Sequence, residues 1–211
     1  MSYFLEVCCP SIDAVKSASQ IGVRRIELCE RLDIGGVTPA EDLIRASLAT
    51  TRLPINVLVR PRGGDFVYSE QEKEAMSESI RLCGKLGVNG VVIGALREDG
   101  SVDVELMQTL VSEARAAGLS VTFHRAFDEC ADPMEALEDI IGLGCDRLLT
   151  SGHAPDAFTG REMIGKLMRA AAGRIVIMAG CGVRPGNIAA IAAASSAPEF
   201  HSSRISEPWT L

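Results

Sequence analysis

The sequence has no long apolar run and no excess of positive charge. No hydrophobic stretch reaches the roughly 20 residues that a transmembrane helix needs, so we expect no membrane span. The 21 Lys and Arg residues are outnumbered by 28 Asp and Glu residues, and the net charge is −7. Charge of this sign disfavours nucleic acid and anionic membrane surfaces as partners.

The cysteine pattern excludes a further class of protein. Seven cysteines are present, but no two form a CxxC pair, so a structural zinc site is not expected. Their number is odd, and they are scattered along the chain. The opening MSYFLEVCCPSIDA has neither the basic region nor the long apolar core of an export signal. We therefore expect reduced thiols and a cytoplasmic location.

Several catalytic signatures are also missing. The chain has no nucleophile elbow, no P-loop and no dinucleotide-binding fingerprint. An inward lysine, which a Schiff-base aldolase needs, is not expected either, because every lysine falls on a predicted helix. These lysines are Lys16, Lys73, Lys85 and Lys166.

Short strand-like runs alternate with helical ones along the whole chain. A helix is predicted over 69–86, where Ser69 and Glu72 form a capping box, and another over 103–117. The alternation predicts parallel βαβ units, and eight strands predict one (β/α)8 TIM barrel over 1–211. A doubly wound sheet is the alternative. The predicted strands are 4–8, 24–29, 55–62, 90–96, 121–127, 147–152, 175–182 and 199–203.

Few residues follow the last predicted strand. Only RISEPWTL remains, so the eighth helix is expected to be absent or truncated. Apolar residues such as Phe200 would then be exposed unless another subunit covers them. This predicts a homo-oligomer, such as a dimer, or a weakened edge of the barrel.

Polar and apolar residues alternate along several strands. Successive side chains of a strand point to opposite faces, and the outer face of a barrel packs against helices, so the polar set is assigned to the interior. Buried charges are costly unless paired, which predicts ion pairs low in the barrel. The charged residues assigned to the interior are Glu6, Glu27, Glu199, Arg25, Arg60 and Arg62.

Other polar residues come late in their strands. The C-terminal ends of the strands carry the active site in (β/α)8 proteins, so these residues are candidates for function. VTFHRAFD shows the pattern, because its apolar strand ends in a His-Arg pair at the C-terminal end of the barrel. The set consists of Cys8, Cys29, Arg60, Arg62, His124, Arg125, Ser151 and His201.

Two glycine-rich turns predict a site for a small anion, a phosphate or a carboxylate. RPRGGDF (60–66) offers Arg60 and Arg62 as forked donors, with Asp65 placed to hold an arginine. AGCGVRPGN (179–187) opens a helix, whose N-terminus attracts anions. Gly180 and Gly182 lie in this second turn, and Ser202 is expected nearby.

These groups suggest an enzyme, a lyase, isomerase or hydrolase. The arginines would hold the anionic substrate. His124 would act as general acid or base, with Glu27 or Glu6 orienting it.

A metal site is the competing interpretation. Cys8 and Cys29 lie on neighbouring predicted strands, both inward by parity, at a strand spacing of roughly 5 Å. Two thiolates suit Cu(I), and His124 or His201 could add an imidazole. Free cysteines also pack as small apolar residues, so the spacing alone leaves both interpretations open.

The ordered segments LEVCC, RIELCE, GGVTP, RPRGGDFVYS, VTFHRAFD, LLTSG, AGCGV and EFHSS resemble the CutC family of copper homeostasis proteins from residue 4 to about 203. The resemblance implies a cytosolic (β/α)8 barrel, commonly oligomeric, with Cu(I) binding proposed at positions that match Cys8 and Cys29. The family's histidines match His124 and His201.

The chain departs from the family pattern in two places. The family's C-terminal segment with the last helix is absent, and Ala40 stands where the family has a helix-capping serine. The resemblance favours Cu(I) binding or trafficking as the function. The enzyme remains the alternative, because several arginines at the mouth would repel a cation.

Overall fold

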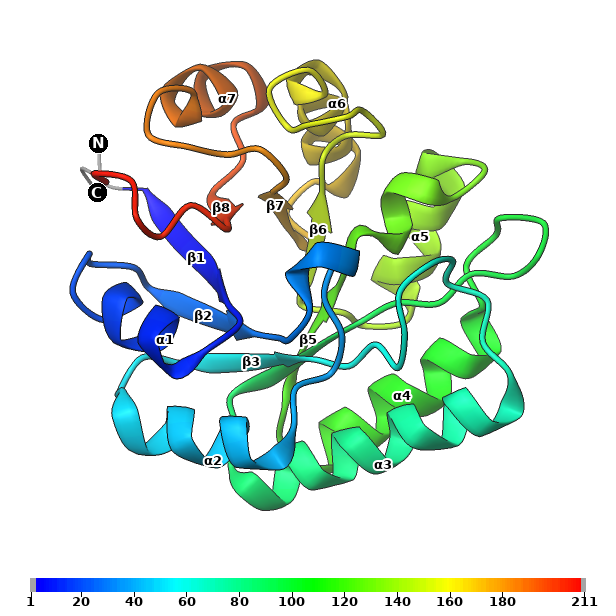
Figure 1. The fold of residues 1–211 in the computed structure, drawn as a ribbon. Helices are drawn as coiled ribbons and strands as arrows, with labels where there is room; N and C mark the ends of the chain where they lie inside the picture. The colour runs from blue at the N-terminus through cyan, green and yellow to red at the C-terminus, as the bar shows by residue number, and fades with distance from the viewer. Residues whose placement is uncertain (1–2, 210–211) are drawn as a thin grey trace.

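The computed structural model describes residues 3–209. Eight parallel strands close into a barrel in chain order, β1 to β8, and β8 pairs with β1. Figure 1 shows the helices around the outside of the strands. The predicted TIM barrel is confirmed. The strands are β1 Phe4–Cys9, β2 Arg25–Leu28, β3 Ile55–Leu58, β4 Gly90–Ile93, β5 Ser120–Phe123, β6 Arg147–Thr150, β7 Val176–Ala179 and β8 Glu199–Ser202.

Four of the seven α-helices begin where the sequence places a capping side chain. The Ser69 side chain accepts a hydrogen bond from the Glu72 backbone N–H, and the Glu72 carboxylate accepts one from the Ser69 backbone N–H, which confirms the predicted capping box. The Asp103 and Asp132 side chains cap two further helices. The helices are α1 Ile12–Ala18, α2 Glu41–Thr50, α3 Glu70–Leu86, α4 Val104–Ala116, α5 Pro133–Gly142, α6 Arg161–Ala171 and α7 Ile188–Ser195, with short 3-10 helices at Leu32–Ile34 and Arg125–Glu129.

Most strands are shorter than the apolar runs that predicted them. β3 ends at Leu58 and β5 at Phe123, so Arg60, Arg62 and His124 belong to the loops above the strands. At β5 the cause is local, because the His124 ring accepts a hydrogen bond from the Ala126 N–H and starts a 3-10 turn. The chemistry-bearing residues are therefore placed by loops as well as by strand parity.

The two faces of the strands form separate clusters. The outward residues pack with the helices into one large core, which includes Leu5, Val57 and Phe123. Inside the barrel, Cys8, Cys29, Leu58 and Val92 form a small apolar cluster, and Leu149 and Met178 are buried there as well. The rest of the interior is largely polar, as the alternation predicted.

No helix follows β8 in the part of the chain that ends at residue 209, as expected. Phe200, however, is only 1% exposed, and the expectation of an exposed Phe200 was wrong. The Tyr3 ring meets it edge-on at 5.5 Å, and Ile205 and Trp209 pack against the same core.

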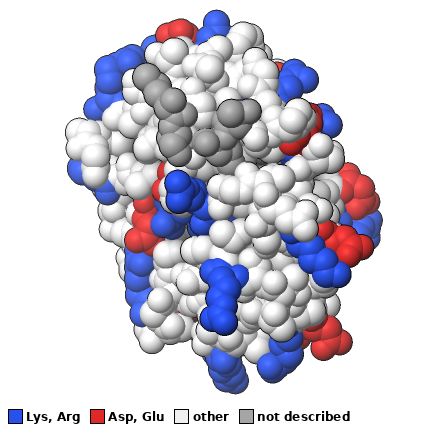
Figure 2. Space-filling view, turned by 90° about the vertical axis from the view of Figure 1, so that its left-hand side faces the viewer, with Lys and Arg blue, Asp and Glu red and all other residues white. Residues whose placement is uncertain are grey.

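The C-terminal segment thus lies against β1 and covers part of the place of an eighth helix (Figure 1). Figure 2 shows that most of the surface on this side is uncharged, with Lys, Arg, Asp and Glu side chains scattered over it. None of the helices in residues 3–209 is long and apolar enough to cross a membrane.

Candidate functional site

A pocket of about 460 Å³ opens at the C-terminal end of the barrel. Its buried part includes Cys8 of β1, Glu27 of β2 and His201 of β8, and both β2 and β8 pair with β1. Arg60, Phe66 and His124 come from the loops after β3 and β5. Leu32, Ile34, Gly182, Arg125 and Ser202 also line it.

Below the pocket, Glu6 is part of a buried ion-pair network. Its carboxylate accepts hydrogen bonds from the Arg25 guanidinium and, at 2.8 Å, from His201 Nδ1. Arg25 also pairs with Glu199, which lies 3.4 Å from the Arg147 guanidinium. Burial favours the neutral acid, but the bond from His201 and the charge of Arg25 outweigh it and lower the pKa of Glu6 to about 2. The structure therefore pairs Glu6 with His201, where the sequence analysis had paired it with His124.

Glu27 forms no ion pair within residues 3–209. Its side chain is buried, Oε1 lies 3.6 Å from Cys8 Sγ, and Oε2 has no hydrogen-bond partner. Burial raises the pKa of this carboxyl, and the negative charge of Glu6 adds to the effect. Two glutamates on adjacent strands thus have opposite environments.

His201 lies between these two glutamates. Burial alone would lower the pKa of its imidazole, but Glu27 and then Glu6 raise it above the ordinary value. Its Nδ1 is committed to Glu6, so Nε2 is the nitrogen left for a ligand.

The thiols of Cys8 and Cys29 lie side by side, as the strand parity predicted. Their Sγ atoms are 2.9 Å apart, and both residues are buried. The hydrogen bond with Cys29, burial and the nearby Glu27 raise the pKa of Cys8 well above its ordinary value. Cys8 lines the pocket, whereas Cys29 lies behind it among Leu58 and Val92.

Arg60 is buried without a carboxylate. Its guanidinium donates to the carbonyl oxygens of Ile34, Gly36 and Gly64 and stacks on the Phe66 ring, while Nε has no partner. Within residues 3–209 the other buried arginine is Arg25, and it is paired with two carboxylates.

His124 lies near Arg60, because the Phe66 ring contacts both side chains. Burial and the charge of Arg60 lower the pKa of His124 to about 3, so the ring is neutral. Nδ1 accepts the Ala126 N–H, which places the proton on Nε2, and Nε2 has no partner. His124 is thus suited to donate a hydrogen bond at Nε2.

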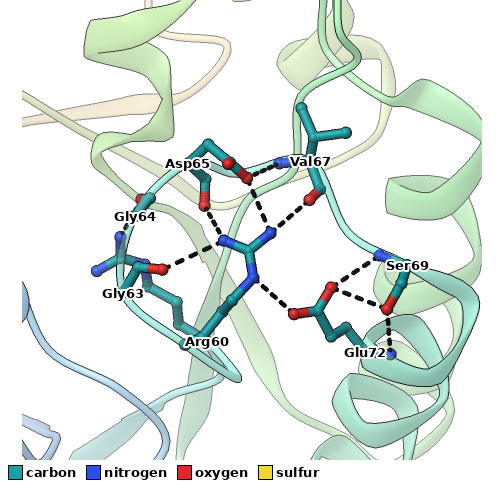
Figure 3. A network of polar contacts seen from close by, with 8 residues as sticks. Arg60, Gly63, Gly64, Asp65, Val67, Ser69 and Glu72 are labelled. Atoms are coloured by element: carbon teal, nitrogen blue, oxygen red, sulfur yellow. Dashed lines mark hydrogen bonds and ion pairs between the residues drawn. The ribbon is translucent and has the colours of Figure 1, made fainter.

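Arg62 and Asp65 do not line the pocket. The Arg62 guanidinium donates to the carboxylates of Asp65 and Glu72 and to the carbonyls of Gly63 and Val67. Figure 3 labels these partners and shows Asp65 and Glu72 on opposite sides of the network. The predicted two-arginine clamp reduces to Arg60, and Arg62 joins the loop to α3.

Two other predicted residues also support the pocket from outside it. The Ser151 hydroxyl donates to the Ala154 carbonyl, and its backbone N–H donates to Asp128. A Cβ at Gly180 would lie 2.4 Å from Leu149 and 3.2 Å from His201, so glycine allows these strands to approach.

Sequence reasoning missed Asp128 and Phe66. The carboxylate of Asp128 holds the Thr150 hydroxyl, the Ser151 N–H and the Arg125 guanidinium, which ties the loop after β5 to β6. The spacing of three residues between Arg125 and Asp128 was a signal for their ion pair. Nothing in the sequence indicated that the Phe66 ring would contact both Arg60 and His124.

Together these features define a (β/α)8 barrel with a polar pocket at the C-terminal ends of its strands. The model of the CutC family matches residues 3–206, and the chain belongs to the CutC family.

Curated relatives and solved structures agree with this. A CutC protein of Parabacteroides distasonis is 48% identical over 96% of this chain and 83% of its own length. One of Chromobacterium violaceum is 44% identical, with 96% and 81% covered. The structure of a putative copper homeostasis protein CutC from Streptococcus agalactiae has a TM-score of 0.90 at 29% identity and covers 97% of this chain and 100% of its own. A protein called QR15, an aldolase, has a TM-score of 0.73 at 17% identity over 97% and 91%, and shares the fold.

Proposed function

We propose that the pocket binds a small organic anion, a carboxylate or a phosphate, and acts on it as an enzyme of the lyase, isomerase or hydrolase type. The observation that carries the proposal is the buried Arg60 guanidinium, which has no carboxylate partner in residues 3–209. A buried charge is costly unless it is paired. An anionic ligand would supply the missing partner.

His124 would contribute a second donor. His124 lines the same pocket, its Nε2 has no hydrogen-bond partner, and the ring stays neutral because its pKa is about 3. A neutral imidazole N–H donates to a carbonyl or anionic oxygen and stabilises charge that develops there. This role replaces the general acid or base that the sequence suggested for His124, because Nδ1 is already occupied.

The test is calorimetric titration with a panel of small carboxylates, sugar phosphates and inorganic phosphate. Removing a hydrogen bond to a charged group costs about 1.5–3 kcal/mol, so Arg60→Gln should weaken binding of any hit by roughly 10- to 100-fold. Arg62→Gln is the matched control, because it removes a guanidinium from the same loop outside the pocket. Equal affinity of the wild type and Arg60→Gln, or no hit at all, would contradict the proposal.

Cu(I) binding or trafficking in the cytoplasm is the second candidate. It is supported by the adjacent buried thiols and by the copper homeostasis name of the Streptococcus agalactiae relative. The soft donors fit Cu(I). A linear S–Cu–S unit, however, requires about 4.6 Å between the sulfurs if each bond is as long as Zn–S. The sulfurs, 2.9 Å apart, would have to separate.

Competition for Cu(I) against a chromophoric chelator under reducing conditions tests this candidate. The wild type should take one equivalent, and both Cys8→Ser and Cys29→Ser should lose it. If either single variant binds as the wild type does, the thiol pair is not the copper site.

A further inference from the structure

We propose that Cys8, Glu27 and His201 form a site for a divalent metal ion of the Zn²⁺ class in the buried part of the pocket. One donor atom from each residue lies within 4.8 Å of those of the other two, and all three residues are buried. Strand pairing brings them together. Cys8 is opposite Glu27 across β1 and β2, and β8 places His201 opposite Glu6, two residues before Cys8.

The donor set matches the preferences of this ion. Zn²⁺ takes thiolate, imidazole and carboxylate ligands, and sites with three protein ligands keep a fourth position open. Tetrahedral bonds of the usual lengths put the sulfur and oxygen ligands about 3.5 Å apart. Cys8 Sγ and Glu27 Oε1 are 3.6 Å apart. The pair therefore already has the required spacing.

The side chains that contact the three donor residues also suit a metal site. A metal-bound histidine commonly donates its other ring N–H to a carboxylate, which fixes the ring. His201 does so, since Nδ1 meets Glu6 at 2.8 Å and Arg25 holds Glu6 in turn. The Glu27 carboxylate has a buried oxygen, Oε2, without a partner.

The charges balance. Glu27 has no ion-pair partner among the described residues. A divalent ion bound by the Glu27 carboxylate and the Cys8 thiolate, with neutral His201, gives a site of zero net charge. A buried site of this kind avoids the cost of an unpaired charge. Metal binding releases the Cys8 thiol proton, together with any proton carried by His201 Nε2 or by the Glu27 carboxyl.

This site differs from the proposed copper site in its use of Cys29. All three ligands line the pocket, and Cys29 does not. The open position therefore faces the cavity that contains Arg60. The inference rests on the donors alone and does not require the anionic substrate proposed above.

Titration of the full chain with Co²⁺ under reducing conditions tests the site. We expect one equivalent, a near-ultraviolet thiolate-to-cobalt charge-transfer band and the intense visible bands of tetrahedral cobalt, all removed by Zn²⁺. Cys8→Ser should abolish the charge-transfer band, and Glu6→Gln should weaken binding by about 10- to 100-fold. Cys29→Ser is the comparison variant, and it should keep the charge-transfer band because Cys29 is not a ligand in this site.

The inference is overturned if the wild type gives no charge-transfer band, if Cys8→Ser keeps it, or if Cys29→Ser loses it as well. His201→Gln gives a second readout should Cys8→Ser fold poorly. It leaves the thiol in place and should weaken Co²⁺ binding at least tenfold, and unchanged affinity would also overturn the site. Anion binding by metal-free protein is measured separately through Arg60, so failure of one proposal is distinguishable from failure of the other.

Discussion

Identical residue types in this barrel have different properties because their partners differ. Arg25 is neutralised by two carboxylates, whereas Arg60 is held by carbonyl oxygens and keeps its charge available to the pocket. The pKa of Glu6 is lowered by His201 and Arg25, whereas burial raises that of Glu27. The charge of each of these groups therefore depends on the side chains that pair with it.

His124 makes a prediction for pH dependence. Burial lowers its pKa from 6.5 to about 3, so between these values the unfolded chain binds a proton that the folded chain does not. The free energy of unfolding should fall as pH decreases from 6.5, by up to about 1.4 kcal/mol per pH unit from this residue.

Urea unfolding at pH 7 and pH 5 measures this effect. Between pH 7 and pH 5, the free energy of unfolding of His124→Gln should fall by about 2 kcal/mol less than that of the wild type. His153→Gln, which changes a half-buried histidine outside the pocket lining, is the control. Equal losses for the wild type and His124→Gln would show that His124 does not remain neutral.

At the scale of elements, the loop after β3 and helix α3 form one unit. The Glu72 carboxylate closes the capping box with Ser69 and also accepts a hydrogen bond from Arg62. The same loop presents Arg60 and Phe66 to the pocket. The start of α3 is therefore joined, through Arg62, to the loop that carries Arg60.

Two substitutions separate these roles of α3. Ser69→Ala removes the cap and should destabilise the protein by about 1 kcal/mol, with little change in ligand affinity. Glu72→Ala removes the cap interaction and also the bond to Arg62, so we expect a larger loss of stability than Ser69→Ala gives, again with little change in ligand affinity. Chemical denaturation and calorimetry measure both quantities. Equal effects of the two substitutions would contradict the coupling.

At the scale of the whole molecule, closure of the barrel joins the two ends of the chain. Glu6 and His201 come from β1 and β8, and they meet because these strands pair. On the outer face of the same strands, Phe200 is buried against Tyr3. The closure therefore places two polar residues of the interior and a buried aromatic contact at the same seam.

Phe200 should contribute strongly to stability. Phe200→Ala removes a fully buried ring and should cost about 3–5 kcal/mol in the free energy of unfolding. Phe158→Ala is the matched control, since Phe158 is 41% exposed, and its cost should be below about 1 kcal/mol. Similar losses for the two variants in urea unfolding would contradict the packing of this seam.

A homo-oligomer, such as a dimer, stays a prediction. It was inferred from an exposed Phe200 and from the family resemblance, and the structure removes only the first reason. The weakly charged face in Figure 2 is the remaining candidate for a contact between copies. Sedimentation equilibrium of the wild type decides it, and a single species of about 22.4 kDa across the concentration range would refute the prediction.

The sequence by itself determined the barrel, its polar interior and the neighbouring positions of Cys8 and Cys29. These features depend on local rules: alternation of strands and helices sets the topology, and the two-residue period of a strand sets which side chains point inward. Sequence also indicated the end of the barrel at which Arg60, His124 and His201 gather.

Only the tertiary structure decided the partners. Arg60 faces the pocket and Arg62 contacts α3, although the two residues are only two positions apart in the same loop. His201, and not His124, pairs with Glu6. These choices depend on loop geometry and on the register of strands far apart in the chain, and the energy of a buried charge depends on its nearest partners. The distances between these partners are set only when the barrel closes.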